Sequence, residues 1–279
     1  MALKRLLLAL LLFSITHAVS ATRFDHAIWD GLLREHVYMI NQGQASQVNY
    51  FGFAQNHGLL QKYLSQISAV RKSDFSGWDK SEQLAFLINT YNAFTVEIIL
   101  RSYSSFATLR IYAPVTIDWN IRLISMLKNQ RELGFISLFG KTLSLNDIEH
   151  GMIRKRGNYN EPRIHFAINH ASIGSPALLN RAFNGMELEE QLDAAIRAFL
   201  SDRSRNRYNE ETGKLEVSEI FDWYGEDFER GWRGWSSLAQ FFAHYRDSLA
   251  DTPRAKELFT TENIEIHFLE FNWMLNEKQ

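Results

Sequence analysis

The chain has 279 residues, of which 46% are hydrophobic, so it has enough apolar material for the core of one large domain or two small ones. Its formal net charge of −2 argues against a basic surface for nucleic acid, and we expect no nucleic-acid partner. It contains no cysteine, which excludes disulfides, lipoprotein anchoring, thiolate catalysis and zinc–thiolate sites.

The N-terminus has the pattern of a secretory signal peptide. Lys4 and Arg5 precede the apolar run Leu6–Phe13, and Ala18 and Ala21 offer small residues at which cleavage can occur. The run is too short to cross a bilayer, which takes about 20 apolar residues. The pattern therefore predicts a cleaved signal peptide over residues 1–21.

Removal of this signal would leave residues 22–279 as one globular domain in the periplasm or outside the cell, because no Gly/Ser linker or internal repeat marks a boundary. No later segment has the sustained apolar character of a membrane span. We therefore expect no transmembrane anchor after signal cleavage.

Hydrophobic periodicity predicts amphipathic helices over residues 25–39 and 56–70, followed by a helix over 82–101. This third helix is apolar on nearly every face, so it should be the buried central element. Asn89 and Asn92 share one of its faces, and buried amides need hydrogen-bond partners. They are either a structural clamp to neighbouring loops or part of the lining of a site.

A capped helix is predicted over residues 144–157. Ser144 and Asp147 have the spacing of a capping box, in which each side chain bonds the backbone of the other. His150 lies on the polar face of this helix with Asp147, and Glu149 lies near the edge of its apolar stripe.

The segment "RIHFAINHASIGSP" alternates apolar and polar residues and then becomes rich in small residues. The alternation predicts a strand over 163–169 with Arg163 and His165 on its polar face. A turn over 170–176 should follow, lying beside the asparagine face of the central helix. Because a buried guanidinium needs a partner, we expect Arg163 to pair with Glu149.

The C-terminal half predicts helices over 185–200 and 236–246, a hairpin that turns at 211–213, and a final strand over 264–268. Helices dominate early and short strands come late. The predicted fold is therefore a single α+β domain, with a buried central helix, surrounding helices and a small, mostly antiparallel sheet.

The polar residues allow three kinds of chemistry. The first is a metal site, with imidazole and carboxylate ligands from Glu149, His150, His165 and His170. The HExxH spacing is absent from the sequence, and histidines on such faces are more often hydrogen-bonded structural groups. We therefore expect no metal and no cofactor.

The second is nucleophilic catalysis by Ser175 or Ser172, with His165 or His150 as the base. A loop is a plausible place for a nucleophile. However, the sequence "SIGSP" lacks the Gly-x-Ser-x-Gly elbow, and serine before proline is common in ordinary turns.

The third is glycan binding by exposed aromatic residues such as Trp232 and Trp235, with Arg233 between them. Sugar rings stack on aromatic faces, and an exported protein meets glycans. The alternative is that these residues pack on one another with cation–π support.

Six blocks of the sequence appear in the order seen in one family: "LAFLINTYNAFTVEIIL", "LSLNDIEHGMIR", "PRIHFAINHASIGSPAL", "EEQLDAAIRAFL", "SEIFDWYGEDF" and "FNWMLN". Between about Asn49 and Asn276 the chain resembles the uncharacterised family called "domain of unknown function 547". The resemblance implies an architecture rather than a reaction. The family's characteristic residues fall on Asn89, Tyr91, Asn92, Glu149, His150, Arg163, His165 and Pro176.

The chain departs from this family at several polar positions. Relatives tend to have cysteine where this chain has His170 and Ser175, and Tyr-Asp-Trp where it has Phe271-Asn272-Trp273. Cysteine, histidine and aspartate in relatives would form a thiol-hydrolase triad with His165 as the base. Here the thiol and the aspartate are absent, and Asn272 can orient an imidazole but carries no charge. Alternatively, the cysteines form a disulfide or redox pair in relatives, whose loss leaves function untouched.

We therefore expect an exported envelope protein with a non-catalytic or decayed site, in which a polar cleft of Glu149, His150, Arg163 and His165 binds a glycan or a peptide. The alternative is a periplasmic hydrolase or acyltransferase with Ser175 as the nucleophile and His165 as the base. The hydrolase or acyltransferase alternative requires the Ser175 Oγ to lie within about 3.2 Å of a histidine nitrogen.

Overall fold

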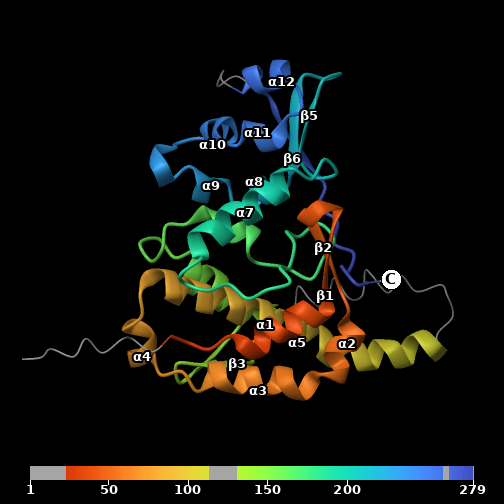
Figure 1. The fold of residues 1–279 in the computed structure, drawn as a ribbon, viewed down its shortest axis with the longest axis vertical. Helices are drawn as coiled ribbons and strands as arrows, with labels where there is room; N and C mark the ends of the chain where they lie inside the picture. The colour runs from red at the N-terminus through yellow and green to blue at the C-terminus, as the bar shows by residue number, and fades with distance from the viewer. Residues whose placement is uncertain (1–22, 113–130, 260–263, 279) are drawn as a thin grey trace, which may run out of the picture.

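The computed structural model describes residues 23–112, 131–259 and 264–278, with side chains omitted for residues 103–112 (Figure 1). The predicted signal peptide lies outside the described residues. The helices are α1 Ala27–His36, α2 Tyr50–Gln55, α3 His57–Ser68, α4 Lys72–Ser76, α5 Lys80–Tyr112, α7 Leu188–Leu200, α8 Ile220–Trp223, α9 Gly225–Phe228, α10 Leu238–His244, α11 Arg246–Leu249 and α12 Pro253–Leu258. The strands are β1 Val37–Ile40, β2 Ala45–Val48, β3 Ile136–Leu138, β4 Lys141–Leu143, β5 Arg207–Asn209, β6 Lys214–Ser218 and β7 Ile266–Leu269. Short 3₁₀ turns lie at η1 Asn41–Gly43, η3 Pro162–Phe166 and η4 Trp232–Gly234, and η2 Asp147–Ile153 is π-helical.

Helix α5 is the centre of the larger part of the molecule. Every residue from 82 to 100 is buried, which confirms the predicted central helix. α5 contacts α2, α3, α7 and η2. By length and composition Lys80–Ser102 could cross a membrane, contrary to the expectation that no such segment follows the signal; here its apolar stretch is entirely buried inside the protein.

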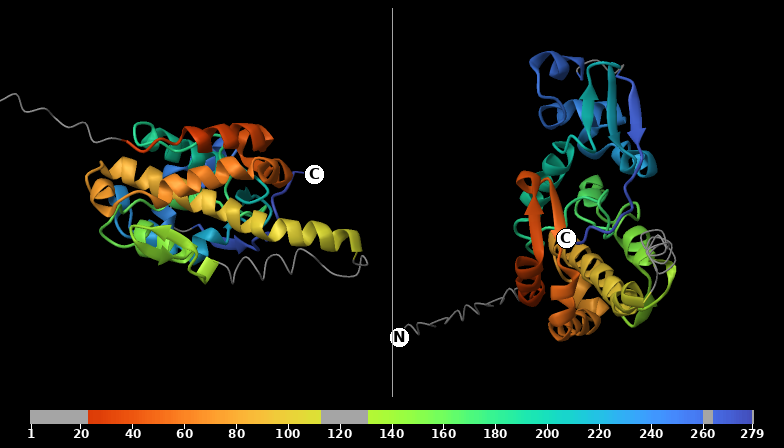
Figure 2. Two further views of the ribbon diagram at one scale, coloured as in Figure 1. Left: turned by 90° about the horizontal axis from the view of Figure 1, so that it is seen from below. Right: turned by 90° about the vertical axis from the view of Figure 1, so that its right-hand side faces the viewer.

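The strands form three small sheets. β1 pairs with β2 and β3 with β4, both antiparallel, while β5–β6–β7 forms a sheet at the opposite end of the molecule from α5 (Figures 1 and 2). The predicted hairpin is the antiparallel pair β5–β6, and the predicted final strand is β7, which pairs in parallel with β6. Three of the four pairings are antiparallel, so the α+β prediction is confirmed.

The buried hydrophobic residues form two clusters, and the elements η3 and α7 contribute residues to both of them. Ile164 of η3 and Leu192 of α7 belong to the cluster around α5, whereas Phe166 and Ile196 of the same elements belong to the cluster under β6 and α10. Figure 1 shows α7 lying between the two parts. Because single elements contribute to both cores, the described chain is one domain.

The predicted strand over 163–169 is wrong, because this segment begins as the 3₁₀ turn η3. The Glu161 carboxylate accepts a hydrogen bond from the backbone N–H of Arg163, and Pro162 fixes φ at the first position of the turn. The alternation of apolar and polar residues predicted a strand with one exposed face, but both faces are buried. Arg163 is 1% exposed and His165 is 4% exposed.

The capping box at Ser144 and Asp147 is confirmed. The Asp147 carboxylate accepts from the Ser144 N–H at 2.8 Å, and Ser144 Oγ accepts from the Asp147 N–H at 3.0 Å. The helix that follows is wider than an α-helix, since the Arg154 N–H bonds the carbonyl of Glu149 five residues earlier. Such π-helical turns are frequent at functional sites.

Candidate functional site

Glu149 lies at the centre of a buried polar network. Its side chain is 1% exposed, and it accepts hydrogen bonds from Arg131 Nη2 at 2.7 Å and from the Tyr224 hydroxyl at 2.8 Å. His170 Nε2 lies 3.8 Å from the same carboxylate. Burial would raise the pKa of Glu149, but the neighbouring His170, Arg131 and His150 outweigh burial and lower the pKa to about 2. Glu149 is therefore an ionised, charge-compensated group at neutral pH.

A second carboxylate, Asp227, organises the other side of the network. Its Oδ2 lies 2.8 Å from His165 Nε2 and accepts a hydrogen bond from Arg154 Nε at 2.6 Å. Burial would raise the pKa of Asp227, but the hydrogen bonds from His165 and Arg154 lower it to about 2. Arg154 also donates from Nη1 to His150 Nδ1 at 2.8 Å, so His150, Arg154, Asp227 and His165 form one connected chain.

The ring of Tyr224 joins the two carboxylates. His165 stacks on this ring, with centroids 4.0 Å apart and an interplanar angle of 15°. The Arg154 guanidinium lies 4.5 Å from the ring centroid, while the hydroxyl reaches Glu149. The site thus depends on Tyr224 for packing as well as for a hydrogen bond.

The histidines of the network are held as neutral imidazoles. Burial lowers the pKa of His165 and of His150, although Asp227 and Glu149 respectively oppose the shift. Burial, helped by the positive charge of Arg131, lowers the pKa of His170 to about 3. A neutral imidazole both donates and accepts a hydrogen bond, so these groups suit a polar, uncharged partner.

A cavity of about 430 Å³ opens onto this network, and we call it the Glu149 cavity. Its wall consists of Arg131, Glu132, Asn146, His150, His170, Trp223, Tyr224 and Trp273. Trp223 and Trp273 stack on each other with centroids 5.5 Å apart and an angle of 25°. His170 is 7% exposed, and its Nδ1 has no hydrogen-bond partner among the described residues. The cavity therefore combines an aromatic wall with a buried polar atom that lacks a partner.

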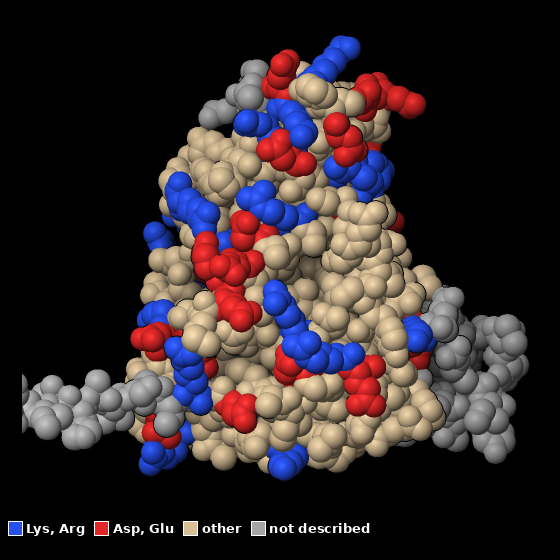
Figure 3. All heavy atoms as spheres, viewed as in Figure 1, with Lys and Arg blue, Asp and Glu red and all other residues tan. Residues whose placement is uncertain are grey.

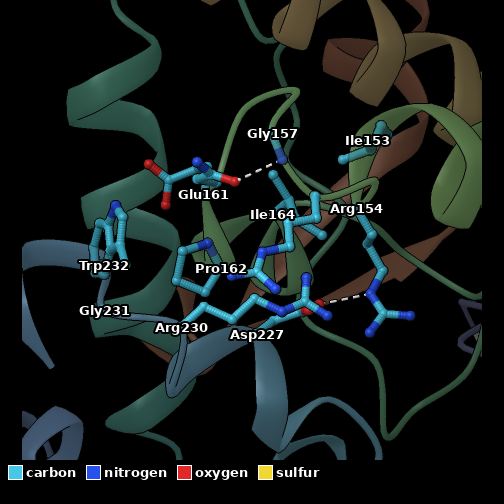
Figure 4. Close-up of a pocket in the computed structure, with 12 residues that line it drawn as sticks. Ile153, Arg154, Gly157, Glu161, Pro162, Ile164, Asp227, Arg230, Gly231 and Trp232 are labelled. Carbon is cyan, nitrogen blue, oxygen red and sulfur yellow. Dashed lines mark hydrogen bonds and ion pairs between the residues drawn. The ribbon is translucent and has the colours of Figure 1, made fainter. Parts of the chain in front are cut away.

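A smaller cavity of about 280 Å³ lies against the other end of the network (Figure 4). Figure 4 shows Arg154 reaching Asp227 on one side, with Trp232 and Glu161 on the other. The connected chain from His150 to Asp227 thus runs from the Glu149 cavity to this second one.

The structure brings together Glu149, His150, His165 and His170, but it does not add Arg163 to them. The Arg163 guanidinium pairs with Glu161 at 2.7 Å and with Glu189 at 2.6 Å, so the predicted pairing with Glu149 is wrong. Glu161 is two residues away across the 3₁₀ turn and Glu189 lies on α7, so two carboxylates already satisfy the guanidinium.

The two asparagines of α5 hold loops, as a structural clamp requires. Asn89 donates from Nδ2 to the Phe183 carbonyl and accepts from the Phe183 N–H, at 2.7 and 3.0 Å. Asn92 donates to the carbonyl of Ala167 and accepts from the N–H of Asn169. The prediction that these asparagines bond the turn over 170–176 is wrong, because their hydrogen bonds go to backbone groups before and after that turn.

The 170–176 loop packs instead against the C-terminal segment. The N–H groups of Ile173 and Gly174 donate to the carbonyls of Met274 and Asn272, both at 2.7 Å. A side chain at Gly174 would approach Asn272 N to 2.8 Å, so this contact requires glycine. The Asn272 side chain is exposed and accepts from the Met274 N–H, which contradicts the idea that it orients a histidine.

Ser175 does not meet the geometry of a nucleophile. It is 3% exposed, and its Oγ bonds Ser172 Oγ at 2.8 Å and accepts from the His170 N–H at 3.1 Å. Within the described part of the chain, neither Ser175 nor Ser172 has a hydrogen bond to a histidine ring. His165, the expected base, is engaged by Asp227.

The tryptophans singled out for glycan binding pack as the alternative predicted. Trp232 lies edge-on to Trp235 with ring centroids 5.1 Å apart, and the guanidiniums of Arg163 and Arg233 lie 4.9 and 4.6 Å from the ring centroid of Trp232.

On the face shown in Figure 3, acidic and basic side chains are intermixed, so this face has no extended basic surface.

Sequence reasoning missed Arg131, Tyr224 and Asp227. Tyr224 and Asp227 stand three residues apart in "FDWYGEDF", where an acidic residue among aromatic ones was a usable signal. Arg131 lies far from every predicted motif, and the local pattern gives no indication of its role.

In the comparisons with known proteins, no curated protein and no solved structure matches the chain. The family model described as "Protein of unknown function, DUF547" matches residues 75–200. This stretch is shorter than the resemblance from Asn49 to Asn276, and it includes Asn89, Glu149 and His165 but not Tyr224 or Asp227. Residues 75–200 of the chain are therefore similar to the DUF547 family of proteins of unknown function, as the sequence blocks predicted.

Proposed function

We propose that the chain is an exported envelope protein that binds a glycan in the Glu149 cavity without catalysing a reaction. The observation that carries the proposal is that the stacked Trp223 and Trp273 line the same cavity as His170. The buried Nδ1 of His170 has no hydrogen-bond partner among the described residues. Aromatic faces suit the C–H faces of sugar rings, and a neutral imidazole suits their hydroxyls. Buried polar atoms are rarely left without a partner, so a ligand or ordered water at Nδ1 is expected.

The charge state of the network supports binding rather than catalysis. Glu149 is ionised and compensated by Arg131, and both of its oxygens are engaged, so it is not positioned as a general base. Ser175 Oγ is directed to Ser172 and to the His170 backbone, which gives the hydrolase alternative no geometric support. Export itself rests on the N-terminal sequence pattern.

The binding proposal is tested by calorimetric titration of the mature protein with neutral oligosaccharides of envelope type, and with short peptides in parallel. We expect saturable binding of an oligosaccharide, weakened at least tenfold by Trp273→Ala. Trp232→Ala, which alters a tryptophan outside the Glu149 cavity, is the matched control and should bind like wild type. Binding of peptides alone, or equal binding by both variants, would overturn the proposal.

Absence of catalysis is tested with a fluorophosphonate probe and simple ester substrates. We expect no labelling and no turnover by wild type. Stoichiometric labelling that disappears in Ser175→Ala would establish the hydrolase alternative instead.

A further inference from the structure

A separate cavity of about 610 Å³ lies at the N-terminal end of α5. Four lysines line it, one each from α4, α5, β4 and the segment after η2: Lys72, Lys80, Lys141 and Lys155. We call it the lysine cavity. It is distinct from the Glu149 cavity, and the two share no lining residue.

The positive charge of the lysine cavity is uncompensated. Its lining contains no aspartate or glutamate. Within the described part of the chain, none of the four ammonium groups forms an ion pair, whereas Lys214 and Lys256 elsewhere pair with Glu265 and Asp247. Desolvation, together with the like charges of Lys80 and Lys141, lowers the pKa of Lys72.

Aromatic rings hold two of the four lysines in place without neutralising them. Lys72 Nζ lies 4.7 Å from the ring centroids of both Phe75 and Phe139, and Lys80 Nζ lies 5.2 Å from that of Tyr159. Cation–π contacts of this kind order a side chain and leave its charge available to a ligand. Four lysines from four separate segments therefore line one partly aromatic cavity, and ring contacts hold two of them.

We propose that the lysine cavity binds a phosphate-bearing ligand. Several ammonium groups around one space suit a tetrahedral dianion, which offers oxygens in several directions, and lysine binds phosphate as a point charge. A planar carboxylate is better matched by the fork of arginine, and no arginine lines the cavity. Phe75, Trp78 and Tyr159 provide an apolar surface for the group that carries the phosphate.

The test measures binding of inorganic phosphate and of pyrophosphate to the mature protein by calorimetry. Binding of vesicles with and without phosphatidylglycerol is measured by sedimentation. The double variant Lys72→Gln/Lys141→Gln removes two charges from the cavity. Lys62→Gln/Lys214→Gln removes two from other surfaces and is the matched control; thermal melts of both verify folding.

We expect one saturable, salt-sensitive site, weakened at least tenfold in the cavity variant and less than twofold in the control. Binding of free phosphates identifies a soluble phosphate ester as the ligand. Binding that is lost in the cavity variant but seen only with anionic vesicles identifies a lipid headgroup. Equal binding by the two double variants, tighter binding of citrate than of pyrophosphate, or no saturable binding in either assay would overturn the proposal.

Discussion

The Tyr224 hydroxyl donates to Oε1 of Glu149 at 2.8 Å and so joins residues 75 positions apart. Glu149 belongs to the stretch matched by the family model, and Tyr224 lies beyond it. The buried network is therefore completed by the C-terminal part of the chain, which also supplies Asp227 and Trp273.

Tyr224→Phe should lower the free energy of unfolding by about 1–3 kcal/mol, the usual cost of leaving a buried acceptor without its donor. The phenyl ring preserves stacking with His165, so the loss reports the contacts of the hydroxyl with Glu149 and Arg131. Urea unfolding measures it. Tyr208→Phe is the control, since Tyr208 makes ring contact with Phe259 and its hydroxyl donates no hydrogen bond among the described residues. Equal stability of Tyr224→Phe and wild type would show that this contact is not formed.

Asn89→Ala should also destabilise the protein by about 1–3 kcal/mol, because both the N–H and the carbonyl of Phe183 lose a buried partner. The exposed Asn272 offers a comparison, and Asn272→Ala should cost about 0.5 kcal/mol or less. Thermal melts compare the two variants. A melt of Asn89→Ala that overlays wild type would refute the clamp.

Stability should fall as the pH is lowered from about 6.5. Burial lowers the pKa of His26 to about 4 and that of His170 to about 3, so the unfolded chain binds protons in this range that the folded chain does not. A further loss should begin near pH 4.5, because the pKa values of Glu149 and Asp227 are lowered to about 2 in the folded state. Their stabilisation is complete above the unfolded values and disappears as pH falls through the folded ones.

The pH dependence is measured by urea unfolding between pH 7 and pH 3. His170→Gln should flatten the slope between pH 6.5 and 4, because it removes a buried imidazole whose pKa is lowered to about 3. An identical slope in His170→Gln and wild type would contradict the assignment of a buried neutral imidazole at this position.

Export should yield a mature chain that begins at Val19 or Thr22, after cleavage at Ala18 or Ala21. N-terminal sequencing of protein from the envelope fraction measures this. Recovery of full-length chain from the cytoplasm would contradict export.

Local sequence signals predicted the parts of the fold that local chemistry determines. The apolar run of α5, the capping box at Ser144 and the β5–β6 hairpin each follow from residues within a few positions of one another. The strand predicted over 163–169 is wrong because this segment is buried on both faces, so its polar residues do not mark a solvent-exposed side.

Only part of the site could be predicted, because local sequence signals identify single polar residues but not their long-range partners. Glu149, His150 and His165 stood out as polar groups on apolar elements, and they do lie in one network. Their partners Arg131 and Tyr224 come from other segments, and long-range packing alone selects them. The partner of Arg163 was mistaken because two other carboxylates satisfy its guanidinium: Glu161 across the 3₁₀ turn, and Glu189, which the packing of α7 brings beside it.

The most direct test of glycan binding in the Glu149 cavity is a crystal structure of the mature protein with the oligosaccharide that binds it best. We predict a sugar ring against Trp273, with a hydroxyl within about 3 Å of His170 Nδ1. An oligosaccharide seated elsewhere, or a Glu149 cavity that holds only solvent at a saturating oligosaccharide concentration, would contradict the assignment.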